Sequence, residues 1–250
     1  MQRDEEQIKI NKDDHQTQAE FIDSSLSSRL GFIQKVYSIL SFQLFYTAAF
    51  TILSLSLPAM REFEATQVWL LVLASITALV IICSLFCYPK NARKVPKNYI
   101  LLSTFTVCEG YVVSAICCNV ATEYENGIDL IFIALSMTVL MTFGLTLYAC
   151  TTKDDFTICT GLLWSLVICL FMLIIFSILF PSRLLQILIS VFAIFLYSVY
   201  VIVDTQLIIG DKRHALQKDD YILGAIILYV DIVMLFIELL KLLVILFGKK

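Results

Sequence analysis

The sequence predicts an all-α polytopic membrane protein with seven transmembrane helices. Hydrophobic residues make up 59% of the 250-residue chain and charged residues only 16%, whereas soluble domains carry about 25% charged residues. The apolar residues form seven continuous stretches, and each reaches the length of about 20 residues that an α-helix needs to cross a bilayer. Transmembrane β-strands would instead alternate apolar and polar residues over about 10 positions. The seven stretches are therefore predicted to be helices.

A polar and mostly acidic segment precedes the first apolar stretch. Residues 1–34 are expected to form an N-terminal tail, flexible as far as about Phe21 because this part has too few apolar residues to build a core. Residues 35–250 are expected to form one transmembrane domain. Its helices are predicted, in order, at residues 36–57, 68–88, 99–120, 128–150, 157–180, 184–210 and 221–247.

The basic residues of the connecting loops are unevenly distributed. With seven crossings, thirteen Lys and Arg residues fall on the side of the N-terminus and four on the opposite side, while Lys241 lies within the last helix. Cytoplasmic loops carry the excess of basic residues in membrane proteins, so we expect the N-terminus to be cytosolic. The C-terminus then lies outside if the seventh helix crosses fully, and in the cytosol if that helix is re-entrant.

Composition and residue types exclude several functions. The net charge of −3 and the lack of a basic, aromatic-rich segment argue against nucleic-acid binding. Serine proteases and metalloproteases use histidine as a base or ligand, and the two histidines, His15 and His214, lie in polar segments. Intramembrane aspartyl proteases pair two aspartates, but here Leu228-Tyr229-Val230 replaces the Gly-x-Gly that precedes their second aspartate. We therefore expect neither an enzyme nor a bound cofactor.

Three carboxylates lie inside the predicted helices at similar depth. At 1.5 Å per residue, Asp231 and Glu109 each lie about 15 Å from the cytosolic end of their helices, and Asp204 lies about 9 Å from that end. The short loop 211–220 makes the helices of Asp204 and Asp231 antiparallel neighbours, so the two carboxyl groups are expected to come within hydrogen-bond reach. Charged groups are costly in hydrocarbon, which makes these residues functional candidates.

Electrostatics predicts how such a pair behaves. Two carboxylates in contact in a low-dielectric site cannot both be ionised without a cation, so one is expected to hold its proton and the pair to titrate as a unit. Calcium prefers hard carboxylate and carbonyl oxygens, which makes Asp204 and Asp231 candidates for transient calcium binding. In the alternative interpretation, Asp204 caps a helix end in contact with water and Asp231 bonds a neighbouring hydroxyl.

Four further charged residues are candidates for a role in ion passage or gating. Glu238 and Lys241 stand at i,i+3 in the seventh helix and are expected to form an ion pair on that helix, with a place beside Glu109 in an ion pathway as the alternative. Lys90 and Arg93 belong to a basic cluster after the second helix. This cluster is interpreted first as a topology signal and second as a partner for lipid head groups or for the gate.

Five segments carry a family resemblance. They are RLGFIQKVYSILSFQL from Arg29, NYILLSTFT from Asn98, TKDDF from Thr152, VDTQ from Val203 and LYVDIVMLF from Leu228. Their combination resembles the lifeguard branch of the transmembrane Bax-inhibitor-motif family, from about Arg29 to the end of the chain. The resemblance implies a fold with six helices around a central seventh.

The resemblance also implies a function. It implies a pH-sensitive calcium leak that restrains cell death, in the endoplasmic reticulum or Golgi rather than the plasma membrane, with calcium as the transported ion. Asp204 and Asp231 would form the proton-sensitive gate, and Lys90 or Arg93 would supply the basic residue that pairs with the first aspartate. The implied partners are the lipid bilayer, calcium ions, protons, and membrane proteins of cell death or calcium handling.

Some positions and functions stay open. Glu238 stands where the family has an uncharged or merely polar residue, and Lys241 replaces a customary arginine, so details of conduction are expected to differ. The alternative function is a non-conducting membrane regulator of cell death that acts through protein–protein contacts. A seven-helix receptor is a weaker alternative, because the seventh helix lacks a retinal lysine in the expected surroundings.

Overall fold

The computed structural model describes residues 2–210 and 214–249, with side chains from residue 26 onward except at 89, 159 and 160. Every regular element in these residues is helical, so the all-α prediction is confirmed. The elements are α1 (Gln2–Ser56), α2 (Pro58–Thr66), α3 (Val68–Cys87), α4 (Pro89–Arg93), α5 (Lys97–Glu123), α6 (Gly127–Thr151), a 3-10 turn (Phe156–Cys159), α7 (Thr160–Leu179), α8 (Arg183–Ile209) and α9 (Tyr221–Phe247).

Six of the described helices are long and apolar enough to cross a membrane. These candidate spans are Leu26–Ser56, Val68–Cys87, Lys97–Glu123, Gly127–Thr151, Gly161–Leu179 and Arg183–Ile209. They coincide with the first six predicted helices, although α1 begins well before residue 36. The seventh predicted segment, 221–247, is the helix α9, and whether it also crosses the membrane stays a prediction.

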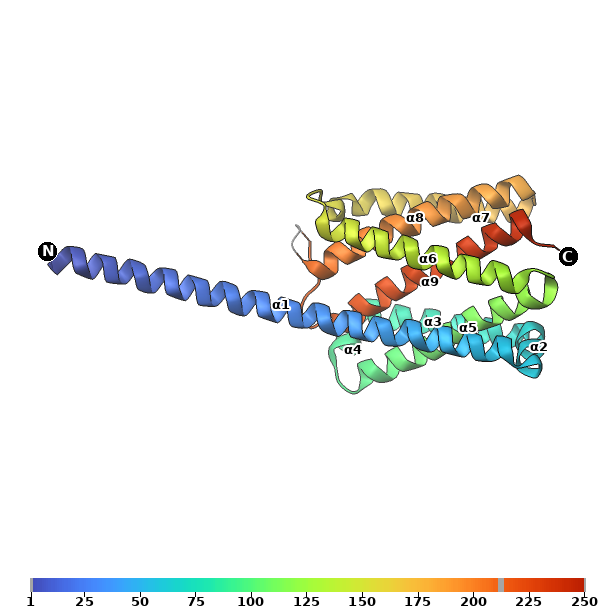
Figure 1. Ribbon diagram of the computed structural model, residues 1–250, viewed down its shortest axis with the longest axis horizontal. Coiled ribbons are helices and arrows are strands. Elements are labelled where there is room, and N and C mark those ends of the chain that lie inside the picture. The colour runs from blue at the N-terminus through green and yellow to red at the C-terminus, as the bar shows by residue number, and fades with distance from the viewer. Residues whose placement is uncertain (1, 211–213, 250) are drawn as a thin grey trace.

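The long helices run between two ends of a bundle (Figure 1). We call the end that holds α4 and the α8–α9 loop the tail end, and the end that holds α2 and the C-terminus the far end.

The N-terminal part of α1 projects beyond the tail end as helix. The sequence analysis did not predict this helix, and the flexibility of the tail to Phe21 stays a prediction. Residues 2–21 lack Gly and Pro, the strongest helix breakers, which suits a continued helix. Because α1 runs unbroken past residue 34, the boundary between tail and membrane domain stays a prediction.

Among the described helices, α9 has the largest share of buried residues. It contacts α1, α5, α6 and α8, and 13 of its 27 residues are buried. The helix α7, in contrast, packs mainly on α8 and turns most of its residues outward. The difference places the core along α9, so a polar side chain on the buried face of this helix is shielded from both lipid and water.

One arginine connects α1 to the end of α8. The guanidinium of Arg29 donates to the carbonyl oxygens of Leu207 (2.9 Å), Ile209 (2.9 Å) and Leu216 (2.7 Å). The last carbonyls of a helix have no partner within the helix, so this side chain caps α8. Gly210 follows in the left-handed region with φ 72°, and a Cβ there would overlap the Arg29 guanidinium. Arg29 and Gly210 together set the direction in which the chain leaves α8.

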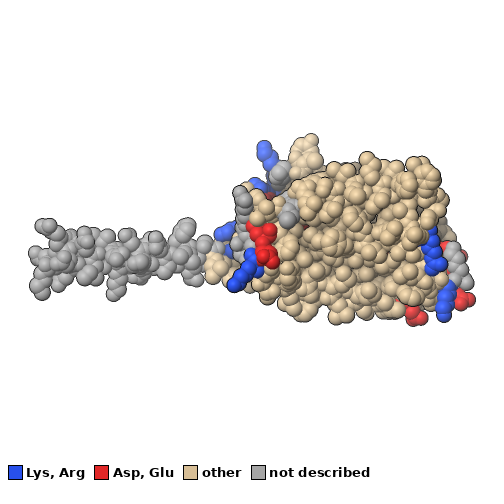
Figure 2. Space-filling model, turned by 90° about the horizontal axis from the view of Figure 1, so that it is seen from above, with Lys and Arg blue, Asp and Glu red and all other residues tan. Residues whose placement is uncertain are grey.

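The outer surface of the bundle is apolar between its two ends. Figure 2 shows acidic and basic residues gathered at the ends and a belt without them in between. Large apolar side chains in the belt are strongly exposed, including Leu140 (72%) and Ile178 (74%). Soluble monomers rarely expose a continuous apolar surface of this kind, so the belt is the surface that faces lipid in this membrane protein.

Candidate functional site

The two aspartates predicted to meet are brought together by α8 and α9. Asp204 lies near the end of α8 and Asp231 in the third turn of α9, and the two helices pack against each other. Both residues are buried, with exposed fractions of 8% and 6%. Their carboxyl groups hydrogen-bond to one another, while Asp231 Oδ2 is buried without a partner. We call these two residues the aspartate pair.

The surroundings of the aspartate pair contain tyrosines and no basic partner. Tyr200 lies within electrostatic range of both carboxyl groups, and Tyr197 within range of Asp231. Within the described residues, neither aspartate forms an ion pair with Lys or Arg. Among the described residues, no ion pair therefore offsets a second negative charge at this point.

This geometry depends on a proton. An ionised carboxylate can only accept hydrogen bonds, so a hydrogen bond between two carboxyl groups requires that one of them is protonated. If the shared proton leaves, two like charges stand in contact where solvent screening is weak. The contact between α8 and α9 at this point is then repulsive unless a cation enters.

Gln206 connects the aspartate pair to the α6–α7 loop. Its amide Nε2 donates to the carbonyl oxygen of Asp154 (2.9 Å), and its Oε1 accepts from the backbone N–H of Phe156 (3.0 Å). Two of the segments that carry the family resemblance, TKDDF and VDTQ, are thus in direct contact. Their contact holds the α6–α7 loop against the turn of α8 that carries Asp204.

Glu109 does not join the two aspartates. It lies half-buried on α5, within electrostatic range of Cys108 and of Tyr229 on α9. Across the described residues, no group of three or more His, Cys, Asp or Glu side chains is close enough to hold one metal ion. Depth estimates placed Glu109 at the right height, but it faces a different side of α9 from Asp231.

The ion pair predicted on the seventh helix is confirmed. Lys241 Nζ lies 3.4 Å from Glu238 Oε2, at i,i+3 on α9. Lys241 also lines a cavity of about 480 Å³ towards the far end, together with Asn119, Glu123 and Gln186. Charged and amide side chains are therefore among the mostly apolar residues that line a hollow on the side of α9 towards the far end.

Comparison with known proteins identifies the family. Residues 29–248 match the family model described as "Inhibitor of apoptosis-promoting Bax1". The chain belongs to the Bax inhibitor family. It is 33% identical to protein lifeguard 3 of Mus musculus over 218 residues, 86% of this chain and 69% of that protein. It is 31% identical to protein lifeguard 3 of Homo sapiens, over 84% of this chain and 67% of that protein. It is 32% identical to protein lifeguard 4 of Mus musculus, over 87% of this chain and 86% of that protein.

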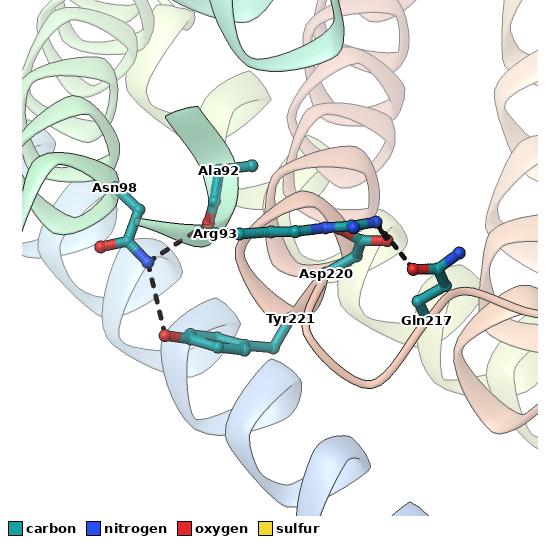
Figure 3. A network of polar contacts seen from close by, with 6 residues as sticks. All are labelled: Ala92, Arg93, Asn98, Gln217, Asp220 and Tyr221. Carbon is teal, nitrogen blue, oxygen red and sulfur yellow. Dashed lines mark hydrogen bonds and ion pairs between the residues drawn. The ribbon is translucent and has the colours of Figure 1, made fainter. Parts of the chain in front are cut away.

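In this Bax inhibitor family chain, Arg93 pairs with a different acid from the one expected. Its Nε and Nη2 donate to the two carboxylate oxygens of Asp220 (2.7 and 2.9 Å), and Nη2 also donates to Gln217 Oε1 (2.9 Å), as Figure 3 shows. Asp220, which precedes α9, raises the pKa of the Arg93 guanidinium through this hydrogen bond and its charge. The expected latch between Arg93 and Asp204 is therefore absent from the structure, and Lys90 is exposed.

The path of the chain after α3 explains this correction. The helix α3 ends at Cys87 and the short helix α4 carries Arg93 to the start of α9. Asn98, which is fully buried, reinforces the same junction: its Nδ2 donates to the carbonyl oxygen of Ala92 (3.2 Å) and to Tyr221 Oη (3.4 Å), as seen in Figure 3. The polar network at the tail end thus secures the start of α9.

The structure also reveals a buried acid that sequence reasoning missed. Glu64 on α2 is only 4% exposed. Its Oε1 accepts from Ser54 Oγ (2.8 Å), and its Oε2 accepts from Ser114 Oγ (2.5 Å) and the Cys118 thiol (3.6 Å). We call these four residues the Glu64 cluster. It joins α1, α2 and α5 near the far end.

A weak signal for the Glu64 cluster was present in the sequence. Gln43, Thr47, Thr51 and Ser54 recur every three or four residues within the first apolar stretch, and all four are buried. Such spacing gives α1 one polar face. A polar face that points inward requires polar partners. Thr47 Oγ1 lies 2.8 Å from Tyr229 Oη, and Ser54 donates to Glu64.

Proposed function

We propose that this protein is a pH-sensitive calcium leak channel of an intracellular membrane, with the aspartate pair as its proton sensor. The observation that carries the proposal is the hydrogen bond between two buried carboxyl groups that have no basic partner among the described residues. Such a contact depends on a proton, and it joins α8 to α9, the described helix with the largest share of buried residues. Gain or loss of this proton therefore changes a helix contact in the core of the bundle.

The proposed gating follows from Coulomb's law. Two unit charges about 4 Å apart repel by about 4 kcal/mol at an effective dielectric constant of about 20. Loss of the shared proton would therefore separate Asp204 from Asp231 or draw in a cation. Calcium suits this role, because it binds carboxylate oxygens and tolerates irregular coordination. Glu109 and the hollow beside Glu238 and Lys241 are the proposed neighbours of the ion path.

The proposed topology has seven membrane crossings and a cytosolic tail end. We propose that α9 is a seventh membrane crossing surrounded by the other six, because it passes from the tail end to the far end of the bundle (Figure 1) and 13 of its 27 residues are buried. The tail end is then cytosolic, since the excess of basic residues lies there. The membrane is proposed to be that of the endoplasmic reticulum or Golgi. The role in restraining cell death follows the name of the matched family.

The experiment uses full-length protein in liposomes with a calcium-sensitive dye, at a series of pH values. We expect Asp231→Asn and Asp204→Asn to abolish the pH response of the flux, because neither variant has a pair of titrating carboxyl groups. Asp129→Asn makes the same chemical change at an exposed acid at the start of α6 and is expected to leave the response unchanged. Unchanged flux and pH response in both pair variants would refute the sensor. Absence of flux from the unmodified protein would favour a non-conducting regulator.

A further inference from the structure

A crevice lies between α1 and α6, with α9 as its floor. The helix α1 packs on α5 and α9, and α6 packs on α8 and α9, whereas α1 and α6 scarcely contact each other within the described residues. Figure 1 shows α9 crossing between them. The space left at this point is a cavity of about 360 Å³. Its volume lies in the range of about 300–1,000 Å³ typical of ligand pockets, and its apolar lining is also typical.

The rim of the crevice is continuous with the lipid-facing belt. Phe45 and Ile52 of α1 and Phe132 and Val139 of α6 line the cavity and are also more than half exposed on the outer surface. In a membrane this opening therefore faces hydrocarbon, and lipid chains reach it without crossing a polar barrier.

The floor of the crevice belongs to the protein interior. Ile232, Val233 and Phe236 of α9 line the cavity, with exposed fractions of 8%, 5% and 9%. Lipid that merely surrounds the bundle cannot reach these side chains. Ile232 and Val233 directly follow Asp231, so whatever fills the crevice touches the helix turn that carries the aspartate.

The shape of the crevice is long and narrow. Its α1 wall extends from Leu44 to Leu55, about 16 Å along the helix at 1.5 Å per residue. Thr51 lines the crevice, and its Oγ1 is buried without a hydrogen-bond partner, so its χ1 torsion must rotate to turn the hydroxyl into the crevice. Thr51 lies five residues before α1 ends at Ser56, about 7 Å along the helix from the far end.

We propose that the crevice binds one acyl chain of a glycerolipid from the leaflet at the far end, with the Thr51 hydroxyl rotating into the crevice to donate to its ester carbonyl. The unfilled slot would deprive its lining of dispersion contacts, and an extended chain restores them along the whole α1 wall. The ester satisfies the buried hydroxyl, which otherwise lacks a partner. The lipid site itself does not depend on the calcium leak. Its effect on the aspartate pair, through Ile232 and Val233, rests on the proposed function.

The test uses full-length protein in liposomes that contain a phosphatidylcholine with a diazirine on one acyl chain. After irradiation, adducts are mapped by mass spectrometry. We expect adducts on Ile232–Phe236 in the unmodified protein and their loss in Ala48→Phe, which fills the crevice. Ala49→Phe is the matched control, because Ala49 is exposed on α1 and does not line the cavity. Adducts on the outer face of α6, at Leu140, should persist in all variants.

Thr51→Val keeps the shape of the side chain but removes the hydroxyl, and it serves if Ala48→Phe does not fold. It is expected to weaken labelling of Ile232–Phe236 without affecting Leu140. Equal labelling of the α9 segment in the unmodified protein, Ala48→Phe and Thr51→Val, or none in the unmodified protein beside strong labelling of Leu140, would overturn the site. Labelling of the segment by a photoactivatable sterol in place of phosphatidylcholine would overturn the choice of a glycerolipid.

A second measurement separates the lipid site from the leak. In the calcium flux assay, Ala48→Phe is expected to change the leak rate while Ala49→Phe leaves it at the level of the unmodified protein. If Ala48→Phe loses its α9 adducts but leaks normally, the lipid site stands and its coupling to the aspartate pair is wrong. If the unmodified protein does not leak at all, the proposed function fails while the labelling result stands.

Discussion

The aspartate pair and the Glu64 cluster are two buried acidic sites with opposite designs. All three carboxyl groups are less than a tenth exposed. Each oxygen of Glu64 accepts a hydroxyl hydrogen from a neighbouring helix, whereas Asp231 has one oxygen without a partner and a second acid as its neighbour. Burial alone therefore does not mark a functional acid. What distinguishes the aspartate pair is that its partner is another acid, so that its contact depends on a proton.

The largest expected effect concerns the aspartate pair. If Asp204 and Asp231 act as a unit, the double variant Asp204→Asn/Asp231→Asn should lose no more of the pH response than either single variant, because each single change already removes the shared titration. The measurement is calcium flux from liposomes across a pH series. Separate, additive contributions from the two aspartates would show that they act independently and would break the contrast with Glu64.

The second prediction concerns the Glu64 cluster. A buried polar group that loses its hydrogen-bond partner costs about 1–3 kcal/mol, so Glu64→Leu should destabilise the protein by about 2–6 kcal/mol, since it leaves two serine hydroxyls buried without their acceptor. Thermal unfolding in detergent measures this loss. Glu64→Gln is the matched control, because its amide can accept from one serine and donate to the other. Its pH response should be that of the unmodified protein; a lost response would make Glu64 a sensor as well.

The third prediction concerns the turn after α8. Gly210→Ala should destabilise the protein by at least about 1–2 kcal/mol, the cost of a left-handed conformation for a residue with a Cβ, because Gly210 has φ 72° and contacts Arg29. The loss appears as a lower unfolding temperature. Gly144→Ala on α6 is the control, since a Cβ there meets nothing within 4 Å. Equal effects of the two substitutions would contradict the capping role.

The smallest expected effect is at Arg93. Because Arg93 is paired with Asp220 and not with Asp204, Arg93→Gln should leave the pH response of the flux unchanged. A slight loss of thermal stability that disappears at high salt is expected for an ion pair this exposed. A pH response altered by Arg93→Gln would contradict this and support an interaction of Arg93 with Asp204.

Sequence reasoning located the helices and the aspartate pair because both depend on position along the chain. Length and apolarity place the helices, and the 1.5 Å rise gives the depth of a residue. The short connection between α8 and α9 made these helices antiparallel neighbours, which predicted that Asp204 and Asp231 meet. Glu109 shows the limit of this argument, since depth does not say which side of a helix a residue faces.

The remaining features depend on how distant segments pack. The burial of Glu64 requires α2 to pack against α1 and α5. No pattern within residues 58–66 predicts that packing. Arg93 was assigned to the wrong acid because the turn from α3 through α4 to α5 directs it towards Asp220. The helical continuation of α1 through the polar segment was missed for a different reason: low apolarity was taken as a sign of flexibility, although helix propensity was present.

Arg29 has a mechanical consequence for the whole bundle. The Arg29 guanidinium donates to three carbonyl oxygens at the end of α8 and in the following loop. An outward displacement of this end of α8 must therefore either move α1 with it or break these hydrogen bonds. A movement of the projecting N-terminal part of α1 is thereby coupled to the turn of α8 that carries Asp204.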